Sequence, residues 1–307
     1  MRKIAICMII LSLLLISGCN KTETTGEIAK SPYIGGSNGI IAEFLDMGIY
    51  NEDSRINEIY EDESFPIEIL LQNKGEYEVD EDDVTITLKG IYLGSFDGIT
   101  SDGILSNEDT IEPVSDTNED GGEETLDFTP GSDDAEYETD FSGSSIDLDI
   151  FAEVVYEYNT EATVKKVCFK EDLQDESICE VNEAKNVYSS GAPIHVTSAS
   201  ESTAGSDKIA VEMIVENVGG GDVAIPDEEF DKRFNKISFE SSDDDKWECR
   251  ANGKLNEGRF DSSGIMKIQC KTIEPMDEDT LYTEDLGITL EYKYRYLIQE
   301  SIRIRKE

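Results

Sequence analysis

Apolar and polar residues alternate in many short runs along this chain, the pattern of β-strands that bury one face. Two of the runs, ILLQNKGEYEV at 69–79 and MIVENVGGGDV at 213–223, share a further feature. In both, alternating apolar positions are followed by Asn-x-Gly, beginning at Asn73 and at Asn217. The alternation predicts a half-buried strand. The Asn-x-Gly predicts the turn that ends it, since Gly accepts positive φ and Asn bonds nearby main-chain amides.

A second pair of matching runs follows later in each copy. Alternate apolar positions at 150–158 match those at 286–294, at an offset of 136 residues against 144 for the first pair. Each run is followed by a polar break and another alternating segment, which predicts a closing hairpin. Two blocks that keep their order and periodicity predict a duplicated domain.

Further strands are expected around these blocks, at 39–47 and 84–88 in the first copy and at 192–198 and 237–239 in the second. About seven short strands per copy, separated by Gly, Asn and Asp turns, are typical of an immunoglobulin-like sandwich. The predicted fold class is therefore all-β, with two tandem immunoglobulin-like β-sandwich domains.

The N-terminus, MRKIAICMIILSLLLISGC, has the features of an export signal. Two positive residues precede an apolar run at 4–16, which is shorter than the about 20 residues of a membrane-spanning helix. Its end, Ile-Ser-Gly-Cys19, resembles the lipobox of secreted lipoproteins. That resemblance implies cleavage before Cys19 and lipidation of Cys19, which would anchor the protein to the extracellular face of the cell membrane. An ordinary cleaved signal peptide or an uncleaved anchor is the alternative.

The expected organisation has four parts: a lipoprotein signal peptide (1–18), a polar tether (19–38), a first sandwich (39–190) and a second sandwich (191–307). The first sandwich is longer because of an acidic insertion at about 91–145. Between Lys89 and Lys165 the sequence contains no Lys or Arg, and apolar residues are few. Such a segment buries little surface, so a long solvated excursion is expected.

The chain is very acidic, with 69 Asp and Glu against 26 Lys and Arg and a net charge of −43. A field of this sign repels nucleic-acid phosphates, so we expect no nucleic-acid partner. It favours divalent cations, cationic partners or a saline medium. The expected partners are the membrane, through the N-terminal lipid, and a protein or glycan at the cell surface.

Beyond Cys7 and Cys19, the chain has four cysteines: Cys168, Cys179, Cys249 and Cys270. An even number in an exported chain predicts two disulfides. Pairing of nearest neighbours is the local choice among three possible connectivities. There is no Cys-x-x-Cys, and His195 is the single histidine, which argues against a zinc site.

The strand–Asn-x-Gly–strand pattern resembles CARDB and related immunoglobulin-like modules of prokaryotic, especially archaeal, cell-surface proteins. The matching residues are Ile67, Ile69, Leu71, Asn73 and Gly75, and again Val211, Met213, Val215, Asn217 and Gly219. The resemblance implies a surface spacer or adhesion module that is not an enzyme. These families have no fixed catalytic residues, so no site is carried over.

One acidic stretch matches the spacing of a calcium loop. Asp116, Asn118 and Asp120 occupy alternate positions, a Gly follows, and Asp127 stands at position twelve. This spacing can wrap oxygen ligands around Ca²⁺, the one cofactor that the sequence suggests. Against it, Glu123 stands where an apolar anchor is usual and no flanking helix is expected. A solvated acidic loop is the simpler interpretation.

Two other patterns have structural explanations. The G-x-S-x-G at 35–39 matches a hydrolase nucleophile elbow, but a tether precedes it, a strand follows it and His195 is the sole candidate base. Alternating tyrosines at 156–158 and 292–296 are suited to a carbohydrate platform, although core or corner packing with a bonded hydroxyl fits their spacing better.

The sequence thus predicts a membrane-anchored cell-surface lipoprotein that acts as a non-catalytic adhesion, scaffold or protein-interaction module. The alternative is a calcium-dependent extracellular binding protein that uses the acidic insertion. An extracellular hydrolase is a third, disfavoured possibility.

Overall fold

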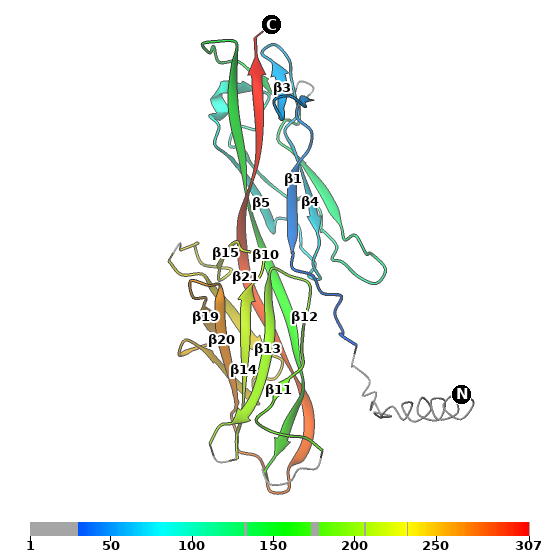
Figure 1. The fold of residues 1–307 in the computed structure, drawn as a ribbon, viewed down its shortest axis with the longest axis vertical. Coiled ribbons are helices and arrows are strands. Elements are labelled where there is room, and N and C mark those ends of the chain that lie inside the picture. The colour runs from blue at the N-terminus through cyan, green and yellow to red at the C-terminus, as the bar shows by residue number, and fades with distance from the viewer. Residues whose placement is uncertain (1–29, 132–133, 173–177, 206, 232, 307) are drawn as a thin grey trace, which may run out of the picture. The chain divides into compact units, whose positions relative to one another are not determined.

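Strands make up almost all the regular structure, as the alternating pattern predicts. The computed structural model describes residues 30–131, 134–172, 178–205, 207–231 and 233–306 (Figure 1). Within these ranges the 3₁₀ turn η1 (Leu93–Ser95) is the one helical element. No helix in the same ranges is long and apolar enough to cross a membrane. The all-β fold class is confirmed.

Two long strands, β10 (Ser145–Lys170) and β21 (Leu281–Arg305), organise the chain (Figure 1). They pair antiparallel from Ser145 opposite Arg305 to Lys170 opposite Leu281, with one register shift between Val164 and Val167. Each strand contributes one end to a first half of the protein and the other end to a second half. We call the stretch where they pass between the halves, 156–160 opposite 290–294, the waist.

In the first half, β10 pairs with β5 (Val84–Lys89), which pairs with β7 (Ile104–Ser106). β21 is flanked by β3 (Ile56–Tyr60), which runs parallel to it and pairs with β2 (Ile49–Asn51). A separate sheet has the order β1 (Ile40–Phe44), β4 (Glu68–Asn73), β8 (Glu123–Asp127). The buried residues of both sheets belong to one apolar core.

In the second half, a six-stranded sheet has the order β11 (Ala184–Lys185), β13 (Ile194–Thr203), β14 (Ile209–Asn217), β20 (Ile265–Thr272), β17 (Trp247–Ala251), β18 (Lys254–Leu255). The other layer is formed by β10 and β21 with β12 (Val187–Ser189), β15 (Asp222–Ala224), β16 (Lys236–Ser241) and β19 (Glu257–Arg259). Each of the four segments expected to form strands outside the repeats contains one. These strands are β1, β5, β13 and β16.

The prediction of closing hairpins after 158 and 294 is wrong, because β10 and β21 continue through those positions. In β10 the polar break includes Thr160, which is fully buried. Its hydroxyl donates to the Ile194 carbonyl at 2.8 Å and lies 2.8 Å from the Tyr292 hydroxyl. A buried Thr with both partners in place continues the strand instead of ending it.

The prediction that residues 91–145 form a solvated excursion is also wrong. This segment supplies β8 to the β1–β4–β8 sheet, and it adds β7 and the pair β6 (Phe96–Asp97) and β9 (Glu136–Tyr137). Ile111, Leu126 and Phe128 are buried in the core. A few apolar residues suffice because they pack into a core that other segments of the chain also build.

The two Asn-x-Gly turns are held by equivalent tyrosines. Asn73 accepts a hydrogen bond from the Tyr158 hydroxyl at 3.0 Å, and that hydroxyl accepts one from the Tyr77 main-chain N–H at 3.2 Å. In the second copy the Tyr294 hydroxyl lies 3.4 Å from the Asn217 side-chain oxygen and accepts from the Gly221 N–H at 2.6 Å. Both blocks of the repeat thus meet in the same way in each half.

The expected reason for glycine in these turns needs correction. Neither Gly75 nor Gly219 has a positive φ. A Cβ on Gly75 would collide with the Tyr158 hydroxyl, and a Cβ on Gly219 with the Tyr294 hydroxyl. Glycine is required at both positions because the tyrosine approaches the main chain closely.

The tyrosines form an aromatic cluster at the waist. Tyr156 lies opposite Tyr294 and Tyr158 opposite Tyr292 in the β10–β21 register. The ring centroids of Tyr156 and Tyr158 are 5.6 Å apart, and those of Tyr156 and Tyr294 are 5.5 Å apart. The prediction of core packing with bonded hydroxyls is confirmed for Tyr158, Tyr292 and Tyr294.

Replacement of Tyr158 by Phe is expected to lower the free energy of unfolding by about 1–3 kcal/mol, because buried partners on Asn73 and Tyr77 lose their hydrogen bonds. Urea denaturation of the disulfide-intact protein measures this. Tyr50→Phe is the matched control: Tyr50 is 59% exposed, and we expect a change within about 0.5 kcal/mol. Equal effects of the two substitutions would contradict a stabilising role for the Tyr158 hydrogen bonds.

Alkaline pH is expected to unfold the protein as the waist tyrosines ionise. Burial raises the pKa of Tyr156, Tyr158 and Tyr292 above the ordinary value and raises the pKa of Tyr294 to about 12. The unfolded chain releases these protons near pH 10, so stability is intact below about pH 10 and falls as the pH rises above it.

Absorbance at 295 nm, followed with circular dichroism, measures this transition. We expect surface tyrosines to ionise first and the buried group to ionise in a cooperative step that coincides with loss of the β signal. Ionisation of every tyrosine in one phase near pH 10, with the fold intact, would be the contrary result.

Candidate functional site

Both predicted disulfides are formed, with the nearest-neighbour connectivity. Cys168 and Cys179 are joined across a sequence separation of 11, and Cys249 and Cys270 across 21. Cys249 and Cys270 lie directly opposite each other on β17 and β20. Cys168 lies near the end of β10, so its disulfide ties that strand to the segment before β11.

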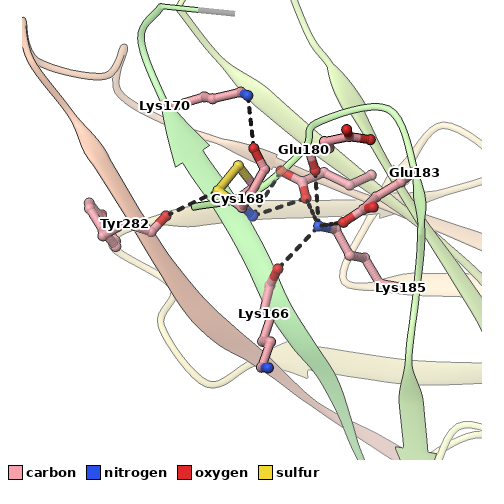
Figure 2. Close-up of a disulfide and its surroundings, with 9 residues drawn as sticks. Lys166, Cys168, Lys170, Glu180, Glu183, Lys185 and Tyr282 are labelled. Atoms are coloured by element: carbon pink, nitrogen blue, oxygen red, sulfur yellow. Dashed lines mark hydrogen bonds and ion pairs between the residues drawn. A yellow bond between two sulfur atoms is a disulfide. The ribbon is translucent and has the colours of Figure 1, made fainter. Parts of the chain in front are cut away.

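A buried ion pair lies beside the Cys168–Cys179 disulfide (Figure 2). The Glu201 side chain is fully buried and the Lys185 side chain is 4% exposed, with Nζ and Oε2 2.8 Å apart. Glu201 also accepts hydrogen bonds from the Cys168 main-chain N–H at 2.9 and 3.1 Å. Lys185 donates further to Glu183 at 2.6 Å and to the Lys166 carbonyl at 3.1 Å.

The two charges of this pair depend on each other. Burial lowers the pKa of Lys185, but hydrogen bonds to Glu183 and Glu201 outweigh it and raise that pKa above its ordinary value. Burial raises the pKa of Glu201, and the bonds from Lys185 and the Cys168 N–H oppose that rise. Because Cys168 lies on β10, Lys185 on β11 and Glu201 on β13, the ion pair and its hydrogen bonds hold these three strands together.

The residues of the calcium hypothesis lie along an extended turn and strand. Asn118 pairs with Ser115 through main-chain hydrogen bonds, and the Asp120 carbonyl accepts from Lys74. Asp127 ends β8, and its carboxylate accepts from the Thr129 N–H and hydroxyl at 2.7 and 2.9 Å. Asp116 is exposed. Across the described ranges, no three His, Cys, Asp or Glu side chains are grouped to hold a metal ion. Calcium binding stays a prediction.

Cys19 and the predicted signal peptide lie outside the described residues. The segment at 32–39, which includes the end of the predicted tether, is held at the waist by Glu76. Its carboxylate accepts from the Ile34 N–H at 2.9 Å, the Gly35 N–H at 2.8 Å and the Gly191 N–H at 2.6 Å.

The elbow-like motif is part of this docked segment. His195 Nε2 lies 2.7 Å from the Gly36 carbonyl oxygen, and the Ala192 N–H donates to the same oxygen at 3.2 Å. Strand β1 follows at Ile40. A nucleophile elbow needs a strand before the Ser and a helix after it, and β1 stands in the place of that helix. The one histidine thus contacts main chain at the junction of the halves.

The surface of the second half carries a cleft of about 340 Å³ that the sequence did not single out. It lies at the edges of two sheets, since β19 ends one and β18 ends the other. Three cations and one carboxylate line it: Lys236, Lys254, Arg259 and Glu257. The rest of the lining is Phe234, Asn252 and Gly258. In a chain of net charge −43, a cleft with an excess of cations is a local reversal of charge.

Phe234 lies beside two guanidinium groups of this cleft and its rim. The Arg259 and Arg233 guanidinium carbons are 5.4 and 5.3 Å from its ring centroid, within the range of cation–π attraction. The Arg259 main-chain N–H donates to Asn252 Oδ1 at 2.8 Å, which fixes the start of the side chain.

The cations of the cleft differ in their partners. Lys236 is paired with Glu228 at 2.9 Å, and Lys254 with Glu257. Within the described ranges, no carboxylate lies within ion-pair distance of Arg259. The arrangement can therefore bind an anion through Arg259. Positive residues at 250–259 were a sequence signal for this site, but only the β16–β19 pairing brings Phe234 and Lys236 to them.

Comparison of the chain with protein-family models, with curated proteins and with solved structures found no match. The resemblance to CARDB and related immunoglobulin-like modules therefore stays a prediction.

Replacing Lys185 by Met is expected to lower the free energy of unfolding by about 3–5 kcal/mol, because Glu201 is left buried without its cation. The double variant Lys185→Met with Glu201→Gln is expected to lose less than the sum of the two single changes. Urea denaturation measures all three. Lys267→Met, which breaks an exposed pair with Glu212, is the control, with an expected cost below about 1 kcal/mol. If the double variant lost as much free energy of unfolding as the two single variants together, the coupling between Lys185 and Glu201 would be contradicted.

Proposed function

We propose that this protein is a lipoprotein anchored through Cys19 to the extracellular face of the cell membrane, where it acts as a non-catalytic adhesion or scaffold module. In this proposal its halves are two immunoglobulin-like sandwiches that share the β10 and β21 strands. The partner is a protein or glycan at the cell surface.

The observation that carries the proposal is the docking of the segment at 32–39 on the waist. Glu76 holds Ile34, Gly35 and Gly191 by three main-chain hydrogen bonds, and the Tyr33 hydroxyl lies 3.2 Å from the Thr163 hydroxyl. Hydrogen bonds to a charged acceptor are among the stronger ones in proteins. A chain leading from a lipidated Cys19 would thus be held at the centre of the strand ladder, with both halves available for contacts.

Two further observations support the proposal. Disulfides persist in oxidising compartments, and the chain forms two of them. The continuous β10–β21 pairing also suits a spacer, because a partner bound to one half is held in a fixed relation to the other.

Fractionation and surface labelling of cells that express the full chain test the anchor. We expect the natural chain in the membrane fraction, carrying lipid and open to an impermeant label. Cys19→Ala is expected to lose the lipid label, whereas Cys7→Ala, within the signal peptide, keeps it. A Cys19→Ala chain that is lipidated and retained like the natural one would refute the anchor.

The adhesion role is tested by crosslinking on whole cells. We expect the labelled chain to recover a defined surface partner. The variant Arg259→Gln, which alters the cleft, is expected to fold and to remain anchored. Repeated recovery of no partner from correctly anchored protein would refute an adhesion or scaffold role.

A further inference from the structure

We propose that the cleft between β18 and β19 binds the carboxylate of an acidic sugar residue, a hexuronate, in a surface glycan. The proposal deepens the function above and rests on it for the place where the glycan is met. Its chemistry depends only on the residues of the cleft.

Arg259 is the group that would recognise the carboxylate. Its guanidinium presents a planar fork of donors that matches two carboxylate oxygens. The side chain is positioned by the Phe234 ring at 5.4 Å and by the hydrogen bond from its main-chain N–H to Asn252. Within the described residues its charge has no carboxylate partner, so an incoming carboxylate displaces no internal ion pair.

The remaining lining suits the rest of a sugar ring. Lys236 and Lys254 keep donors beyond those used by Glu228 and Glu257, since an ammonium group has three. The Asn252 amide nitrogen adds a donor, and Phe234 adds an apolar wall. A volume of about 340 Å³ is at the lower end of the range of ligand pockets and is enough for one sugar ring.

The charge of the whole protein selects among anionic ligands. A net charge of −43 repels polyanions and acidic proteins over distances of about a Debye length, roughly 8 Å at physiological salt. An isolated carboxylate on an otherwise neutral sugar meets little of that repulsion, and it meets the reversed charge inside the cleft. The observations therefore favour a glycan with separated acidic residues over an acidic polypeptide.

Calorimetric titration of the disulfide-intact protein tests this, with glucuronate as the probe, glucose as the neutral ring and N-acetyl-dialanine as a peptide carboxylate. We expect glucuronate to bind at least about tenfold more tightly than either comparison, and its affinity to fall as salt is added. Binding of glucose as tight as that of glucuronate would overturn the carboxylate site. Tighter binding of the peptide would overturn the glycan in favour of a protein terminus.

Variants locate the site. Arg259→Gln is expected to weaken glucuronate binding by about tenfold or more, and Arg259→Lys also weakens it because the fork is lost. Arg250→Gln, an exposed arginine paired with Glu248 outside the cleft, is the matched control and leaves binding unchanged. Circular dichroism confirms that each variant is folded. Unchanged binding by folded Arg259→Gln would refute the proposal.

The titration separates this proposal from the proposed function. It needs neither lipid nor membrane, so a failure of Cys19 lipidation leaves its result intact. Conversely, a cleft that binds no hexuronate leaves the anchor and the crosslinked partner to be decided by their own experiments.

Discussion

The antiparallel ladder between β10 and β21 is the constraint on which the rest of the structure depends. The side-chain period of a strand is two, so a slip of one residue would move every buried residue of a half to its outer face. Both strands keep even-numbered positions buried through the waist, from Ile150 to Val164 in β10 and from Leu286 to Tyr294 in β21. The register of one half therefore fixes the register of the other. The shift between Val164 and Val167 comes only where β10 nears its disulfide.

The waist is where this ladder could most easily fail, because polar groups are buried there. Four buried hydroxyls there are paired across the two strands or with a turn: Thr160 with Tyr292, Tyr158 with Asn73, and Tyr294 with Gly221. A satisfied network of this kind rigidifies a core, whereas a half-satisfied one weakens it. The segment at 32–39 is also bound here, through Glu76, so the waist joins three separate parts of the chain.

Local signals made much of the fold predictable from the sequence. Alternation located the strands, Asn73 and Asn217 located two equivalent turns, and the even number of cysteines predicted two disulfides, with the pairing one of three possibilities. What was missed depends on contacts distant in sequence. In the sequence, Thr160 looks like part of a polar break. In the structure its hydroxyl is paired with the Ile194 carbonyl and the Tyr292 hydroxyl, so the strand continues. Residues 91–145 have too few apolar residues to order alone, yet Leu126 finds a core completed by β4. The candidate cleft was hidden for the same reason, because it joins residues on either side of the β16–β19 pairing.

The scarcity of positive charge gives the cleft its significance. With 26 Lys and Arg against 69 acids, every cation is surrounded by candidate partners. On β21, Arg295 is taken by Asp222, Arg303 by Asp147 and Arg305 by Glu58, which relieves repulsion along the ladder. Arg259, by contrast, is exposed, lies beside the Phe234 ring and has no carboxylate within ion-pair distance among the described residues, so its guanidinium is open to a ligand.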